Sequence, residues 1–164
     1  MFKPKQILVP TDFSAPAWSA LEDASAIAET YGASLDVIHV WDIPTFAVPG
    51  DIAGYALPNT LIDAVSAQSH NMMEELLNQA RAKGVAIRKA SVVPGNAGRG
   101  IVEFAALGSY DLIVVGSHGR TGLARAMLGS VAERVVRHAP CPVLVVTGKH
   151  DAAPGLAQSQ VPKL

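Results

Sequence analysis

Residues 111–119 read DLIVVGSHG, and Gly129-Ser130 follows after nine further residues. An apolar strand at 111–115 thus leads into a glycine-spaced loop and then into a helical pattern at 130–138. Glycine tolerates positive φ and lets backbone N–H groups approach a ligand closely. The exposed N–H groups of a helix start, together with the helix dipole, favour an anion. This order of strand, glycine loop and helix is therefore the arrangement that suits a phosphate site.

Strand-like and helix-like patterns alternate along the chain. We expect strands at Gln6–Pro10, Ser34–Trp41, Val85–Val93, Asp111–Val115 and Pro142–Val146, and helices at Ser14–Tyr31, Thr60–Lys83, Asn96–Gly108 and Ser130–His138. Such alternation predicts an α/β protein whose parallel sheet is covered by helices on both faces. Ligands bind in such sheets beyond the carboxyl ends of the strands, where the strand order reverses. The first and fourth strands would bring their ends together if the order reverses between them.

Local signals mark several helix ends. Ser14 is a plausible N-cap, and Gly32 is typical of a helix stop. The segment Ser130-Val131-Ala132-Glu133 has the pattern of a capping box, in which Ser130 satisfies an amide and Glu133 reaches back. Gly98 and Gly100 stand where helix formers are usual, which predicts that the third helix begins late. Residues 42–59 read as a long loop, either a lid beside the ligand or a passive insert.

Composition places the chain among globular proteins. Its 164 residues are 49% hydrophobic and 16% charged, which predicts one domain over residues 1–147 followed by a loose tail at 148–164. The net charge is −1 and no segment is basic, which argues against nucleic-acid binding. No apolar run is long enough to span a bilayer, and the start lacks a signal-peptide pattern. The single cysteine, Cys141, fits a reducing cytosol, so we expect a cytoplasmic protein.

The sequence resembles the universal stress protein family, in its ATP-binding subgroup. The resemblance runs from about Lys3 to Thr147 and is carried by the segments 7–14, 39–40, 111–120, 128–133 and 140–146. The family's ATP signature is Gly, two residues, Gly, nine residues, Gly, then Ser or Thr. This chain meets it at Gly116, Gly119, Gly129 and Ser130. The resemblance implies a three-layer α/β/α fold with a five-stranded parallel sheet in the order 3-2-1-4-5, similar to the adenine nucleotide alpha hydrolases, together with bound ATP and a homodimer.

The resemblance also implies roles for individual residues. Asp12 would hydrogen-bond the nucleoside, because a carboxylate accepts from an amino group or a ribose hydroxyl. Gly116 would let the ribose pack against the backbone, and Gly129 would let amides face phosphate oxygens. The expected nucleotide-binding residues are Pro10, Thr11, Asp12, Val40, Gly116, Ser117, His118, Gly119, Arg120, Gly129, Ser130 and Val131. We expect no protein-bound metal, since Mg²⁺ or Mn²⁺ would be carried by the nucleotide.

Simpler roles stay open for some of these residues. Asp12 could instead cap the first helix, and the glycines could serve turns alone. Arg120 either clamps phosphates or is solvated, and Arg125 is a weaker candidate of the same kind. His118 either donates to a phosphate or orients the loop. Phosphate contact at Ser130 is compatible with capping if the ligand meets backbone amides.

The sequence predicts an ATP-binding stress or signalling protein whose shape or partner affinity changes with nucleotide occupancy. The chain lacks the Gly-Lys-Ser/Thr element of a P-loop, so we expect no enzyme beyond slow ATP hydrolysis or autophosphorylation. The alternatives are a phosphotransferase or hydrolase, a nucleotide-free interaction dimer and, more remotely, a flavin carrier. Strand 142–146 should be an exposed apolar edge, and the family's homodimer pairs through it. A downstream protein partner is implied, but nothing in the sequence names it.

Overall fold

A computed structural model describes residues 2–42, 59–118 and 128–147, and these residues form five strands and four helices. The strands are β1 (Gln6–Pro10), β2 (Ser34–Trp41), β3 (Lys89–Pro94), β4 (Leu112–Gly116) and β5 (Val143–Val146). The helices are α1 (Ala15–Tyr31), α2 (Asn59–Ala82), α3 (Ala97–Leu107) and α4 (Ser130–His138). Strands and helices alternate as the sequence predicts.

The five strands make one parallel sheet in the order β3-β2-β1-β4-β5. This confirms the predicted fold class and strand order. The chain moves outward from β1 to β2 and β3, and then crosses back to β4 on the other side of β1. The strand order therefore reverses between β1 and β4, and the carboxyl ends of these two strands flank the switch point.

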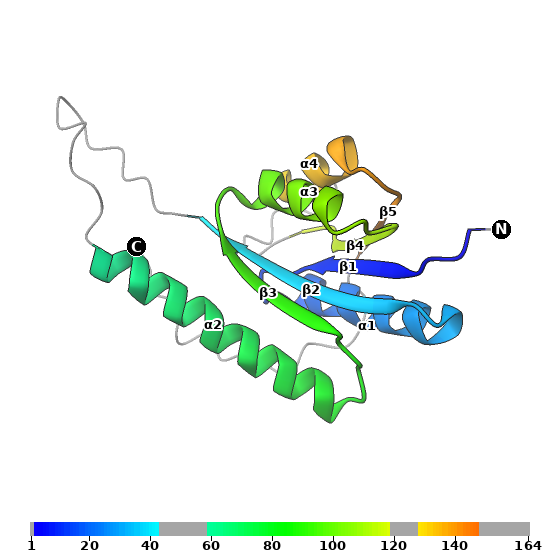
Figure 1. Cartoon of the computed structure of the whole chain (residues 1–164), viewed down its shortest axis with the longest axis horizontal. Coiled ribbons are helices and arrows are strands. Elements are labelled where there is room, and N and C mark those ends of the chain that lie inside the picture. Colours follow the sequence, from blue (N-terminus) through cyan, green and yellow to red (C-terminus); the bar gives the residue numbers. More distant parts are fainter. Residues whose placement is uncertain (1, 43–58, 119–127, 148–164) are drawn as a thin grey trace.

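Two helix pairs cover the two faces of the sheet (Figure 1). Helices α1 and α2 pack on one face around Ile7, Val9, Leu35 and Val37, and α3 and α4 pack on the other around Leu8, Ile38 and Ile113. Neighbouring residues of one strand thus enter opposite cores, because side chains alternate across a sheet. Helix α1 begins as predicted, with Ser14 as its N-cap, and Gly32 ends it at a left-handed φ of 67°.

Two predicted element starts are wrong. The third strand begins at Lys89 rather than at Val85, because the chain after α2 first packs Val85 and Ile87 against the α1–α2 core. Helix α3 begins at Ala97, so its two glycines do not delay it. A Cβ on Gly98 would lie 2.7 Å from Cδ of Arg134, and one on Gly100 would lie 3.1 Å from Cγ1 of Val40. The glycines therefore let α3 pack closely against α4 and β2.

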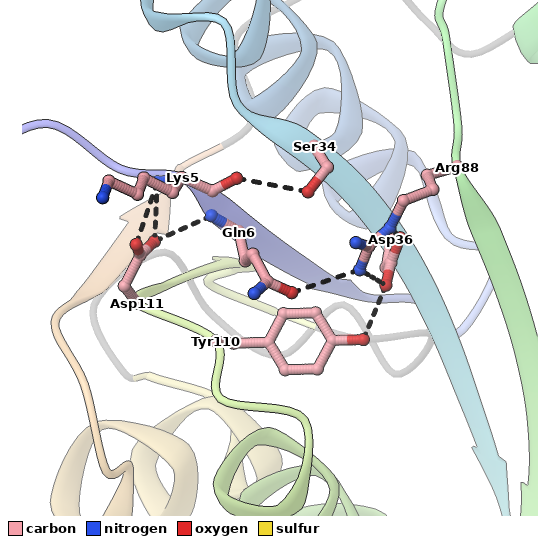
Figure 2. Close-up of polar contacts among 7 residues, drawn as sticks. All are labelled: Lys5, Gln6, Ser34, Asp36, Arg88, Tyr110 and Asp111. Atoms are coloured by element: carbon pink, nitrogen blue, oxygen red, sulfur yellow. Dashed lines mark hydrogen bonds and ion pairs between the residues drawn. The ribbon is translucent and has the colours of Figure 1, made fainter.

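Polar side chains join the amino ends of the strands to one another (Figure 2). The Asp111 carboxylate accepts from the backbone N–H of Lys5 at 2.9 Å and of Gln6 at 3.1 Å. Buried Asp36 accepts from Arg88 at 2.6 Å and from the Tyr110 hydroxyl at 2.7 Å. Burial opposes the Asp36 charge, but the bonds from Arg88 and Tyr110 outweigh it and lower the pKa of Asp36. Burial and the bond to Asp36 raise the pKa of Tyr110 to about 12.

Candidate functional site at the carboxyl edge

A tight turn follows β1 at the switch point. The hydroxyl of buried Thr11 accepts from the N–H of Phe13 at 3.0 Å. Asp12 Oδ1 accepts from the N–H of Ser14 at 3.1 Å and also from the Ser14 hydroxyl. Ser14, and not Asp12, is therefore the N-cap of α1, with its hydroxyl 3.4 Å from the N–H of Ala17. Asp12 therefore does not cap α1 itself. It supports the cap indirectly, by accepting hydrogen bonds from Ser14.

Gly116 ends β4 against the start of α1. A Cβ at this position would lie 2.8 Å from both C and O of Pro16 and 3.0 Å from N of Ala17. Those are backbone atoms, which cannot swing aside, so only glycine allows β4 and α1 to approach this closely. The structure thus gives Gly116 a packing role that the sequence pattern did not indicate. The predicted ribose contact remains a prediction.

Ser117 connects β4, β5 and the start of α4. Its N–H donates to the Val146 carbonyl at 2.8 Å, and its carbonyl accepts from the N–H of Gly129 at 2.8 Å. Its buried hydroxyl lies 2.9 Å from Nδ1 of His118. Nε2 of His118 is buried and has no hydrogen-bond partner in the part of the chain that the structure describes. The Gly129–Ser117 bond places the first turn of α4 directly beside the end of β4.

Helix α4 begins at a glycine. Gly129 is its N-cap residue, and among residues 2–42, 59–118 and 128–147 no side chain hydrogen-bonds the first amides there. The predicted capping box is therefore wrong. Helical bonding already begins at Gly129, whose carbonyl accepts from the N–H of Glu133 at 2.8 Å, so Ser130 lies one position inside the helix. Glu133 instead pairs with Arg137 one turn later, at 2.9 Å.

The other predicted site residues are placed as follows. Pro10 and Val40 lie on the adjacent strands β1 and β2 and are both buried. Val40 packs in the core beneath α3 and α4, where its Cγ1 would lie 3.1 Å from a Cβ placed on Gly100. Ser130 and Val131 are exposed on the first turn of α4. Gly119, Arg120 and Arg125, together with most of the 42–59 loop and the 148–164 tail, lie outside the described residues.

A contact between His39 and the β1 turn at this edge was not predicted from the sequence. His39 Nδ1 lies 2.8 Å from the Thr11 carbonyl, and the rings of His39 and Phe13 are 4.5 Å apart. The only signal in the sequence was a histidine near the end of an otherwise apolar strand.

Two kinds of site do not occur within residues 2–42, 59–118 and 128–147. No three His, Cys, Asp or Glu side chains gather there as they would around a metal ion. In the same ranges, no helix is both long and apolar enough to cross a membrane.

The fold places this molecule among the doubly wound α/β proteins. At its switch point lie the start of a helix and a strand that ends in glycine. Residues 3–147 match the model of the universal stress protein family, and the chain belongs to that family. Universal stress protein MJ0531 of Methanocaldococcus jannaschii is 38% identical over 144 residues, covering 87% of this chain and 81% of that protein.

Solved structures agree with this assignment. The structure of MJ0577, also from Methanocaldococcus jannaschii, has a TM-score of 0.72 and 31% identity, and the match covers 92% of this chain and 100% of that one. A universal stress protein in complex with cAMP has a TM-score of 0.61 and 26% identity, and the match covers 89% of this chain and 98% of that one.

Proposed function

We propose that this universal stress protein binds ATP at the carboxyl edge between β1 and β4 and acts as a nucleotide-dependent regulator. The observation that carries the proposal is the open start of α4. Its N-cap is a glycine, no side chain of the described residues caps it, and the Gly129–Ser117 bond of 2.8 Å fixes it beside β4. The first amides of a helix need a partner from outside the helix, and the helix dipole makes an anion a favourable one.

The residues present fit a nucleotide. Backbone amides of Ser130 and Val131 would bind phosphate oxygens, and both residues are exposed. Asp12, at the end of the neighbouring strand, supplies an acceptor for the hydroxyl or amino groups of a nucleoside. Pro10, Thr11 and Val40 would line the base, with Gly119 and Arg120 completing the phosphate loop. The relative solved with cAMP supports an adenine nucleotide as the ligand.

Regulation fits this site better than rapid catalysis. The chain offers no P-loop lysine for the terminal phosphates, and Mg²⁺ or Mn²⁺ would be carried by the nucleotide. We infer that hydrolysis or autophosphorylation is slow if it occurs. Turnover by the purified protein tests this inference, and ADP release at ordinary enzymatic rates would favour the phosphotransferase alternative. A rate unchanged in Gly119→Val would show that another site is responsible.

We further propose that the protein is a homodimer that pairs through β5. This strand is the last in the sheet and pairs with β4 on one side. Its Leu144 side chain is 39% exposed, and Val136 on the neighbouring helix α4 is 46% exposed. An apolar strand at a sheet edge is a template for pairing with another chain, and a second copy presents the same edge. Light scattering after gel filtration gives the mass that tests this.

The deciding experiment for nucleotide binding is calorimetry on the purified full chain with ATP, ADP, AMP and cAMP. We expect ATP to bind more tightly than millimolar, and mass spectrometry of the heat-released small molecules to detect any nucleotide that co-purifies. ATP binding no tighter than millimolar would contradict the proposal and favour a nucleotide-free interaction dimer. The proposed setting is the cytoplasm, where ATP is abundant, and pull-down with and without ATP would search for the downstream partner.

A further inference from the structure

His39 contacts both residues that flank Asp12. Its Nδ1 lies 2.8 Å from the Thr11 carbonyl oxygen. A carbonyl can only accept, so Nδ1 carries the proton and donates it. On the other side of Asp12, the Phe13 ring lies 4.5 Å from the His39 ring, with the two planes 47° apart. A single side chain on β2 therefore holds the turn after β1 at two points.

The turn that His39 holds has a strained backbone. Phe13 has a φ of 64°, which non-glycine residues rarely adopt. Bonds inside the turn support this conformation, from the Phe13 N–H to the Thr11 hydroxyl at 3.0 Å and from the Ser14 N–H to Asp12 Oδ1 at 3.1 Å. Strained residues persist where their surroundings over-determine them, and they cluster at ligand sites. His39 adds a contact from outside the turn to these bonds within it.

The support acts on the orientation of Asp12. The Thr11 carbonyl belongs to the same planar peptide unit as the Asp12 N–H, so a bond to that oxygen fixes the plane from which Asp12 starts. The contact with the Phe13 ring fixes the residue that follows. We propose that His39 is a positioning residue for the nucleoside half of the ligand, which it serves by orienting Asp12. This inference rests on the proposed nucleotide site, because it assigns Asp12 the role of binding the base or ribose.

The proposal predicts that loss of His39 weakens binding of the nucleoside half of the ligand and not of the phosphate half. A binding group that is already oriented before the ligand arrives loses less conformational entropy on binding, so the ligand binds more tightly. His39 contacts the β1 turn, whereas the phosphates would be bound at the start of α4. Loss of the His39 bond should therefore weaken the binding of ATP, and should leave inorganic tripolyphosphate, which has no nucleoside, unaffected. A general loosening of the protein would weaken both ligands.

The test compares His39→Phe, which keeps a ring but has no N–H donor, with the wild type. We expect ATP to bind about tenfold more weakly, the size of effect that loss of the bond to the Thr11 carbonyl can produce, with tripolyphosphate affinity unchanged in competition with a fluorescent ATP analogue. The matched control is His70→Phe on α2, which removes a bond of the same kind, from Nδ1 to the Ser66 carbonyl at 2.8 Å. It should bind both ligands as the wild type does.

A second pair of variants carries the test if His39→Phe is poorly folded. The amide nitrogen of asparagine lies near the position of Nδ1, and that of glutamine lies near Nε2. His39→Asn should therefore restore ATP affinity, whereas His39→Gln should not. Equal ATP affinity in the wild type, His39→Phe and His39→Gln would overturn the inference, and so would equal losses for ATP and tripolyphosphate. Failure of the wild type itself to bind ATP would instead contradict the proposed function.

Discussion

Replacing Ser130 by proline is the sharpest perturbation of the proposed phosphate site, because it removes one backbone N–H and little else. Ser130 is the first residue of α4, where the fixed φ of proline, about −65°, suits a helix start. The preceding Gly129 has φ −61° and ψ 148°, in the extended region that a residue before proline prefers. Ser130 is also exposed and makes no capping bond, so the substitution removes no hydrogen bond between its side chain and the described residues at the helix start.

The expected loss follows from the bond that this amide would make. A hydrogen bond to a charged phosphate oxygen contributes about 1.5–3 kcal/mol. Removing it should raise the Kd for ATP by about 10-fold to 150-fold. The free energy of unfolding of the ligand-free protein should change by no more than about 0.5 kcal/mol, the usual range for a surface substitution. Ser130→Pro should therefore lower the affinity for ATP without changing the free energy of unfolding. This combination is expected of an amide that bonds a ligand and not the folded protein.

Calorimetry with ATP and urea unfolding without it provide the two measurements. Ser130→Ala keeps the amide and should retain both ATP affinity and stability. Asn96→Ala calibrates the stability scale, since Asn96 does cap its helix, accepting from the Arg99 N–H at 3.2 Å, and its loss should cost about 1 kcal/mol. ATP binding by Ser130→Pro at the wild-type affinity would refute the reasoning. An equal loss in Ser130→Ala would show that the hydroxyl, and not the amide, is the ligand contact.

Three further predictions concern the edge strand, the close approach at β4 and the amino-end network. Leu144→Lys should convert a dimer into a folded monomer, measured by light scattering, whereas Leu107→Lys, at an 88% exposed position on α3, should leave the mass unchanged. Gly116→Ala should lower the free energy of unfolding by about 1–3 kcal/mol in urea titrations, because its Cβ would press on the backbone of Pro16. Tyr110 has a folded-state pKa of about 12 against a reference of 10.0, so its contribution to stability is complete below pH 10 and is lost as the pH rises toward 12. Tyr110→Phe should therefore be less stable at neutral pH by about 1–3 kcal/mol, since buried Asp36 loses a donor, and should lose less stability than the wild type on alkaline titration.

Most of the fold was predictable because its signals are local. Alternation of apolar strands with helical patterns gave the α/β class, and Ser14 and Gly32 correctly marked the ends of α1. The errors arose where a distant contact decides the outcome. Val85 and Ile87 have the alternation of a strand, but they contact the α1–α2 core before the chain reaches the sheet at Lys89. Gly98 looks unfavourable in a helix until Arg134 of α4 is seen to occupy the space of its missing Cβ.

The candidate site was predictable in position and less so in detail. The glycine spacing pointed to the end of β4, and the switch point brings that end beside Asp12. The spacing of Ser130 and Glu133 also satisfied a capping box, yet the N-cap is Gly129, and Ser130 is already the first residue of the helix. Sequence spacing records which residues are three apart, but it does not record which carbonyl starts the hydrogen-bond ladder. The bond from His39 to Thr11 was equally hidden, because it joins two strands through a carbonyl that any residue would supply.

The helix starts at the carboxyl edge differ in whether a side chain hydrogen-bonds their first backbone amides. In a parallel α/β sheet, each helix begins near the carboxyl end of the strand before it, so several helix starts compete for one anion. Within the described residues, Ser14 caps α1 and Asn96 caps α3, while α4 has no side-chain cap. A capped helix has already filled part of its donor capacity, and an anion there would have to displace the cap. Of these three helix starts, α4 is therefore the one that suits the proposed phosphate, and the strained turn before α1 is left to orient Asp12 toward the rest of the ligand.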